Sequence, residues 1–239
     1  MSNAGNPVSP LVRAARKLAA TLLPQACFLC SAPSGNSFLC PACMASLPHL
    51  DSPCCPVCAL PTPAAEVCGA CLKRKPHFDA TRAVFRYEFP VDRLIQSLKY
   101  AHRLASADFL GKALLPLAEV ARPQLILPVP LSPARLAERG FNQAVEIARA
   151  LSRSLGLPLE TAHIHRRIDT QPQARLPWKE RANNMRHAFE CDTDLSGIEV
   201  LVVDDVMTTG ATLNELAGTL KAHGAKRVEN CVLARALKD

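Results

Sequence analysis

Hydrophobic and polar positions after about residue 80 alternate between two patterns. Short runs of branched apolar residues are typical of strands buried on both faces, and longer stretches with apolar residues every three or four positions are typical of helices. The predicted strands span residues 83–89, 125–129, 187–191, 199–203 and 227–234, and the predicted helices span residues 91–100, 105–121 and 141–155, with another after residue 212. This alternation predicts an α/β fold in which helices cover both faces of a mainly parallel sheet.

The pattern near the amino terminus predicts an amphipathic helix within residues 7–24. Apolar residues recur at helical spacing there, with Arg13, Arg16 and Lys17 between them. Such a helix is too short and too charged to cross a bilayer, and no convincing cleavage site of a secretion signal follows it. We therefore expect no membrane span and a cytoplasmic location.

Eight of the chain's eleven cysteines form four C-x-x-C pairs. The complete pattern, C-x2-C-x9-C-x2-C, occurs twice, and the two copies are 28 residues apart. Large apolar residues are scarce in this part of the chain, so bound metal would supply much of its stability. The sequence thus predicts a small cysteine-rich module over residues 25–75 and a larger domain over residues 76–239.

The spacing of these cysteines favours zinc. Two thiolates three residues apart can turn toward one metal ion, and two such pairs complete a tetrahedron. The repeat favours sequential pairing, with one ion per copy, while interleaved pairing stays open; disulfides would need an oxidising compartment, of which the sequence has little other sign. The expected ligands of two structural Zn²⁺ ions are Cys27, Cys30, Cys40 and Cys43, and Cys55, Cys58, Cys68 and Cys71.

A second candidate site begins where the apolar run Val200–Val203 stops at two acids, Asp204 and Asp205. Small residues follow at positions 208–212 and lead into a helical pattern, so backbone N–H groups of a strand-to-helix turn can face an anion. The acids would repel a phosphate, and the hydroxyl groups of a sugar are their natural partners. A phosphorylated sugar satisfies both halves of this motif.

The thirteen residues from Val200 to Thr212 resemble the signature with which type I phosphoribosyltransferases bind 5-phosphoribosyl-1-pyrophosphate (PRPP). The resemblance implies that Asp204 and Asp205 hold the ribose hydroxyls and act in catalysis. It also implies that the 5′-phosphate lies in the loop formed by Thr208, Thr209, Gly210, Ala211 and Thr212.

Positive charge around this motif favours anionic ligands. Ligands of parallel sheets bind beyond the carboxyl ends of the strands, so Arg135 and Arg139, after the predicted 125–129 strand, are candidates to clamp pyrophosphate, and Lys99 is a weaker one. The net charge is +7, and much of it lies in the basic segment 163–186, which we interpret as a lid or as a loop without catalytic contact. PRPP or DNA would suit this charge.

The chain as a whole resembles the ComF family of competence-associated proteins, in which a zinc module precedes a phosphoribosyltransferase-like domain. The resemblance rests on the cysteine pairs, Leu98–Tyr100, Pro128–Leu131, Arg139–Gln143, Gln171–Asn184 and the acid-pair loop, all in the family's order. It implies the type I phosphoribosyltransferase fold preceded by a double zinc ribbon.

Two functions from different classes follow. An enzyme would transfer the phosphoribosyl group of PRPP to a nitrogen nucleophile, with Mg²⁺ beside the departing pyrophosphate. A non-catalytic PRPP-binding adaptor would instead contact single-stranded DNA or a protein of the competence machinery. Aromatic residues that could stack on bases are scarce in the cysteine module, so the sequence supports DNA binding there only weakly.

Overall fold

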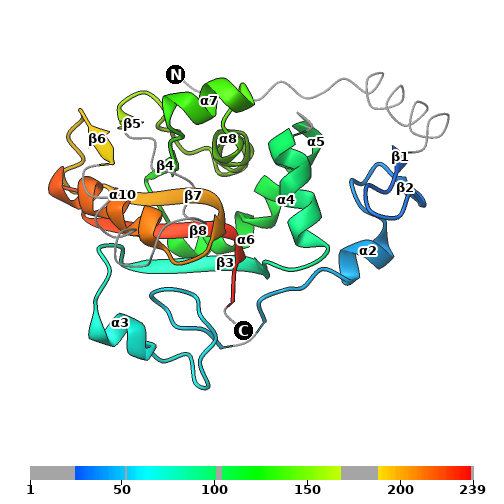
Figure 1. The fold of residues 1–239 in the computed structure, drawn as a ribbon, viewed down its shortest axis with the longest axis horizontal. Helices are drawn as coiled ribbons and strands as arrows, with labels where there is room; N and C mark the ends of the chain where they lie inside the picture. The colour runs from blue at the N-terminus through cyan, green and yellow to red at the C-terminus, as the bar shows by residue number, and fades with distance from the viewer. Residues whose placement is uncertain (1–24, 52, 101–103, 168–187, 238–239) are drawn as a thin grey trace. The chain divides into compact units, whose positions relative to one another are not determined.

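The computed structural model describes residues 25–51, 53–100, 104–167 and 188–237 (Figure 1). The chain divides into two compact units, residues 1–47 and residues 48–239. The two cysteine repeats therefore lie in different units, and the second repeat shares its unit with the sheet. The division of the chain at residue 75 stays a prediction.

The core of the second unit is a four-stranded parallel sheet, which confirms the predicted mainly parallel arrangement, but the strand expected at 187–191 is not part of it. Its strands are β3 (Ala80–Arg86), β4 (Leu125–Pro128), β7 (Glu199–Met207) and β8 (Arg227–Arg235), in the order β3-β8-β7-β4. β8 pairs with β3 on one side and β7 on the other, and its last residue, Arg235, lies opposite Met207. β4 pairs with β7 and ends opposite Val203, just before the two acids of β7, and ligands of parallel sheets bind beyond the carboxyl ends of the strands.

Helices join and cover the strands. They are α4 (Val91–Tyr100), α5 (Leu104–Ala113), α6 (Leu115–Ala121), α7 (Pro133–Arg139), α8 (Gln143–Leu155) and α10 (Ala211–Ala222). The single helix predicted over 105–121 is two helices, because Pro116 lacks a backbone N–H and is tolerated only in the first turn of a helix.

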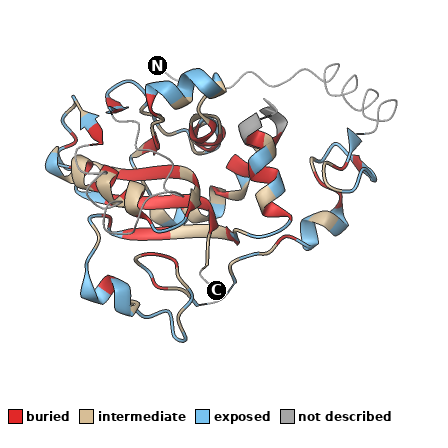
Figure 2. Cartoon of the chain, in the orientation of Figure 1, coloured by how far each residue is buried: buried red, intermediate tan, exposed pale blue. Residues whose placement is uncertain are grey.

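Both faces of the sheet are buried (Figure 2). Val200 and Val202 of β7 belong to one apolar cluster with residues of α10, among them Leu216. Leu201 and Val203 point to the opposite face because side chains alternate along a strand, and both are fully buried. The helix α8, which contacts β4 and β7, is therefore needed to cover that second face.

Two expectations about the ends of segments need correction. β7 runs to Met207 instead of stopping before Asp204, because its parallel pairing with β8 continues past the two acids. The stretch from residue 163 is not irregular at its start, since β5 (Ile164–Arg166) pairs antiparallel with β6 (Phe189–Cys191). The rest of the expected lid, residues 168–187, lies outside the described residues.

The predicted amino-terminal helix, 7–24, also lies outside the described residues. Within the described part of the chain, no helix combines the length and the apolar character that a bilayer crossing requires.

Candidate ligand site and metal centres

The eight cysteines of the repeats form two clusters, grouped as the sequential pairing predicts. Within each cluster the sulfur atoms lie within 4.8 Å of one another. Cys30 Sγ and Cys40 Sγ are 3.7 Å apart, and Cys58 Sγ and Cys68 Sγ are 3.5 Å apart. Four thiolates at about 2.3 Å from a tetrahedral zinc ion would be about 3.8 Å apart, so both clusters fit a structural zinc ion. The clusters are Cys27, Cys30, Cys40 and Cys43, and Cys55, Cys58, Cys68 and Cys71.

The backbone repeats along with the cysteines. Ser31 N donates to Cys27 O at 2.9 Å, and 28 residues later Ala59 N donates to Cys55 O at 2.9 Å. Ser31 and Ala59 both have positive φ angles, 61° and 56°, which turn the chain sharply after each first C-x-x-C pair. The second pair of each repeat opens a short helix, α2 (Pro41–Ala45) or α3 (Gly69–Lys73). In the first unit, β1 (Gln25–Ala26) also pairs with β2 (Pro33–Gly35).

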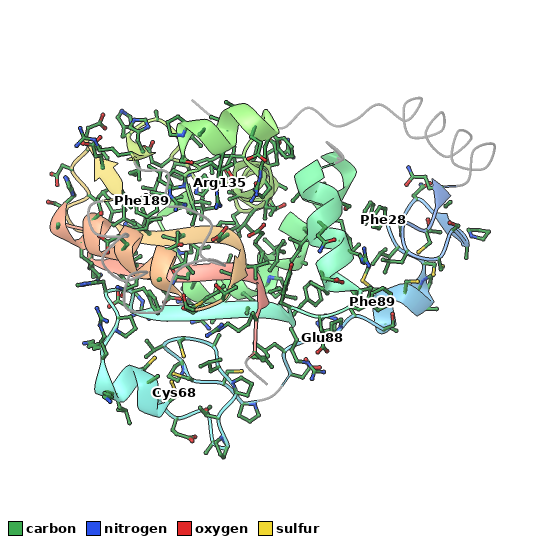
Figure 3. The ribbon with its side chains drawn as sticks, viewed as in Figure 1. Phe28, Cys68, Glu88, Phe89, Arg135 and Phe189 are labelled. Carbon is green, nitrogen blue, oxygen red and sulfur yellow. The ribbon has the colours of Figure 1, made fainter. Side chains whose placement is uncertain are left out.

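The second cysteine cluster packs into the core of its unit. Cys55, Cys58 and Cys71 are buried and belong to the same apolar cluster as Phe78 and Met207. Figure 1 shows the segment that carries α3 beside β3, and Figure 3 labels Cys68 on it. This cluster therefore lies against the sheet that carries the candidate ligand site.

The remaining cysteines have no ligand geometry. Cys231 is fully buried in β8, and its burial raises its pKa to about 12, so the thiol stays protonated at neutral pH. Burial also raises the pKa of Cys54 and of Cys191. Cys231 therefore has a packing role in the core.

The two acids lie within β7, close to its carboxyl end. Asp205 is 6% exposed, and its carboxylate accepts hydrogen bonds from Val206 N at 2.7 Å and from Gln143 Nε2 at 3.3 Å. The carboxylate of Asp204, which is half-buried, accepts one from Asp205 N at 2.9 Å. Hydrogen bonds to the charged form hold both carboxylates in fixed orientations.

The loop 208–212 forms the turn from β7 into α10. Gly210 is the N-cap residue of α10 and has a φ of 79°, which favours glycine. A Cβ atom at this position would lie 2.5 Å from Cε of Met207, which is the end of a flexible side chain and would have to move, so the backbone conformation is the main reason for glycine here. Thr208 and Thr209 are exposed, and the loop lines a small cavity of about 30 Å³ together with Asp204. The predicted anion turn and the first acid therefore meet.

Arg139 and Asp205 are joined by a residue that the sequence reasoning missed. Arg139, on α7, donates from Nη1 to Gln143 Oε1 at 3.1 Å, and the amide of Gln143 donates to Asp205. Asn142 caps α8 and donates from Nδ2 to Val129 O at 2.9 Å, which fixes the helix start beyond β4. The only sequence signal for Gln143 was its place in the Arg139–Gln143 segment.

The other candidate cations are less closely tied to the acids. Arg135 is half-buried on α7 (Figure 3). Lys99 lies in α4, and its side chain is outside what the structure describes. Arg139 is therefore the basic residue that the described contacts connect to Asp205.

A larger cavity of about 440 Å³ opens beyond the end of β4. Prolines and leucines make up much of its wall, and it shares no lining residue with the cavity at 208–212. Its polar wall contains Asn142, Glu146, Glu160 and Arg166. No sequence pattern marked this cavity, because its walls come from separate segments.

Comparison with known proteins places both parts of the chain. The double zinc ribbon domain matches residues 18–72, and the phosphoribosyl transferase domain matches residues 141–239. Among solved structures, a purine phosphoribosyltransferase from Pyrococcus horikoshii aligns at 25% identity and a TM-score of 0.36, over 54% of this chain and 71% of that one. The sheet, the helices and the domain match define a protein with a phosphoribosyltransferase-type fold preceded by a cysteine-rich zinc-ribbon module.

Several curated proteins align with a large part of this chain. The DNA utilization protein YhgH of Salmonella typhi is 33% identical over 162 residues, which cover 65% of this chain and 71% of that protein. Competence protein F of Haemophilus influenzae is 35% identical over 158 residues, with coverages of 65% and 66%. Competence protein ComFC of Bacillus subtilis is 33% identical over 112 residues, with coverages of 46% and 44%. The chain belongs to this ComF/YhgH family.

Proposed function

We propose that the chain binds PRPP at the carboxyl end of β7. The observation that carries this proposal is the meeting of Asp204 with the 208–212 loop around one small cavity, which offers a carboxylate and the start of a helix to a single ligand. Backbone N–H groups of the loop would hold the 5′-phosphate, assisted by the dipole of α10. Asp204 and Asp205 would accept hydrogen bonds from the ribose hydroxyls.

The reaction that suits this ligand is displacement at C1 of the ribose. A nitrogen nucleophile forms a bond to C1 while the bond from C1 to the pyrophosphate oxygen breaks, and pyrophosphate leaves with the electron pair. Positive charge grows on the ribose ring, close to the two carboxylates, which would stabilise it. Because pyrophosphate is a good leaving group, positioning of the ribose would supply much of the rate.

The pyrophosphate would lie toward α7. Arg139 is connected to Asp205 through Gln143, so its guanidinium lies on the side of the acids that faces α7. Arg135 is on the same helix, and Lys99 completes the predicted set. Mg²⁺ bound with the pyrophosphate would offset the negative charge that these side chains leave unpaired.

A second candidate function is that of a PRPP-binding adaptor without turnover. The relatives that carry the words DNA utilization and competence in their names favour this alternative, because those words describe handling of DNA and no transfer reaction. In that case PRPP would act as a regulator, and a zinc ribbon or the basic segment 163–186 would contact single-stranded DNA or a partner protein of the competence machinery.

Calorimetric titration with PRPP, with and without Mg²⁺, tests binding. Asp205→Asn should weaken PRPP binding by about 10-fold to 100-fold, because a charged hydrogen-bond acceptor is lost. Asp192→Asn, which removes the same charge from an exposed residue after β6, should leave the affinity unchanged. Equal affinities of wild type and Asp205→Asn would contradict the proposed site.

Release of pyrophosphate separates the two functions. Wild-type protein with PRPP, Mg²⁺ and a panel of nucleobases should release pyrophosphate only with an acceptor base if it is an enzyme, and the release should disappear in Asp205→Asn. Tight binding of PRPP without release, together with salt-sensitive binding of single-stranded DNA, would support the adaptor.

A further inference from the structure

Arg235 connects the second cysteine cluster to the phosphate loop. It is the last residue of β8, it is 3% exposed, and it lies opposite Met207 in the sheet. Its Nε donates to Cys58 O at 2.9 Å, and its Nη1 donates to Met207 O at 2.9 Å and to Thr208 O. One guanidinium therefore contacts the backbone of a zinc-ligand candidate and the backbone at the start of the 208–212 loop.

The guanidinium of Arg235 is a buried positive charge, and the second cysteine cluster is the nearby group that can compensate it. The four hydrogen bonds that it makes within the described residues, the last to Ala236 O at 2.8 Å, all end on carbonyl oxygens. A buried cation is stable only if its charge is compensated. Four thiolates around one Zn²⁺ ion carry a formal charge of about −2, so the occupied second cluster supplies negative charge close to Arg235.

The hydrogen bond from Arg235 to Cys58 O also links the position of the cysteine turn to the position of the 208–212 loop. A bound ion holds the turn that begins at Cys55, and this turn sets the position of the Cys58 carbonyl. The side chain of Met207 is a second link between the cluster and the loop. It is buried in one apolar cluster with Cys58, and its Cε lies next to Gly210. Loss of metal from the second cluster would release the Cys58 carbonyl and, through Arg235, the carbonyls of Met207 and Thr208.

We infer that Arg235 is a positioning residue that makes the phosphate loop competent to bind its ligand only when the second cysteine cluster holds its metal. This inference rests on the proposed binding of PRPP and extends it, because it assigns the second zinc site a part in ligand binding. The first cluster belongs to the other compact unit and serves as the internal control.

Two matched cysteine variants test the inference. Cys58→Ser and Cys30→Ser change equivalent positions of the repeat, and each should lower the zinc content from two ions per chain to one. Cys58→Ser should weaken PRPP binding by about tenfold, as expected when about 1.4 kcal/mol of loop organisation is lost, while Cys30→Ser should bind PRPP like the wild type. Thermal unfolding and circular dichroism show whether each variant is folded.

Arg235→Lys tests the connecting side chain directly. A lysine ammonium keeps the charge but cannot reproduce the fork of the guanidinium, so PRPP binding should weaken by about tenfold with both zinc ions retained. In a double-mutant cycle, Cys58→Ser should then weaken binding much less in the Arg235→Lys background than alone. If Cys58→Ser does not fold, the PRPP affinity of Arg235→Lys is the test. An Arg235→Lys variant that holds two zinc ions and binds PRPP like the wild type overturns the inference.

The outcomes separate the inference from the proposed function. A wild-type chain that does not bind PRPP contradicts both. A wild-type chain that binds PRPP, while Cys30→Ser and Cys58→Ser weaken binding equally or leave it unchanged, contradicts the inference alone. Additive effects of Cys58→Ser and Arg235→Lys would also show that Arg235 does not mediate the coupling.

Discussion

The two cysteine repeats have the same local structure in different surroundings. Ser31 and Ala59 share a positive φ and the same hydrogen bond, and both repeats continue into a short helix at the second pair of cysteines. Yet Cys58 and Cys71 are in the apolar cluster that also contains Met207, next to the 208–212 loop, whereas the first repeat belongs to the other compact unit, residues 1–47. The same cysteine spacing therefore goes with the same local fold, and burial against the sheet determines which other parts of the chain each cluster contacts.

The largest expected difference between the units is in stability. Cys71→Ser should lower the free energy of unfolding of residues 48–239 by about 3 kcal/mol or more, because a buried metal site is lost from a shared core. Cys43→Ser, the equivalent change 28 residues earlier, should leave that unfolding transition unchanged. Thermal unfolding followed by circular dichroism, with zinc analysis, measures both. Equal losses would show that the two clusters support one common core.

Two glycines with positive φ, one in each compact unit, allow a second comparison of the two units. Gly35 in the first unit has a φ of 62°, and nothing lies within 4 Å of the position of an added Cβ. Gly35→Ala should therefore lower the free energy of unfolding only by the strain of an alanine at positive φ, about 1 kcal/mol. Gly210→Ala adds the displacement of Cε of Met207, the end of a flexible side chain, and should cost about 1–2 kcal/mol and weaken PRPP binding. Chemical denaturation and calorimetry measure these effects, and equal costs would show that the Met207 side chain moves aside without a measurable loss of stability.

The smallest expected effect concerns Asp79, which lies between the second cysteine repeat and β3. Burial alone would raise the pKa of Asp79, but the hydrogen bond and charge of Lys221, at 2.7 Å, and the hydrogen bond from Val228 N, at 2.8 Å, outweigh burial and lower it. The contribution to stability is thus present above the pKa of the unfolded chain, near 4, and is lost as the pH falls through the lower folded value.

Asp79→Asn should therefore be about 1 kcal/mol less stable than the wild type at pH 7, and the difference should shrink below about pH 4. Asp51→Asn is the matched control, because Asp51 stands 28 residues earlier and is exposed. Denaturant unfolding at a series of pH values measures both variants. A difference for Asp79→Asn that does not change with pH would exclude the ion pair as its cause.

Local patterns in the sequence were enough for much of this protein. The spacing of the cysteines predicted two four-thiolate clusters, because ligands three residues apart are brought together by one turn of the chain. The run of apolar residues before Asp204 predicted a buried strand, and the small residues after it predicted the loop at the start of α10. These features depend on neighbours along the chain, which a sequence displays directly.

Contacts between distant segments could be decided only by the tertiary structure. Gln143 meets Asp205 because α8 packs on β7, and Arg235 reaches Cys58 across 177 positions of sequence. A glutamine at a helix start and an arginine at a strand end have no distinctive sequence pattern. Their partners are backbone or side-chain groups that come near only when the sheet forms, so the sequence by itself determined the two kinds of site, and the packing of the sheet determined how they are connected.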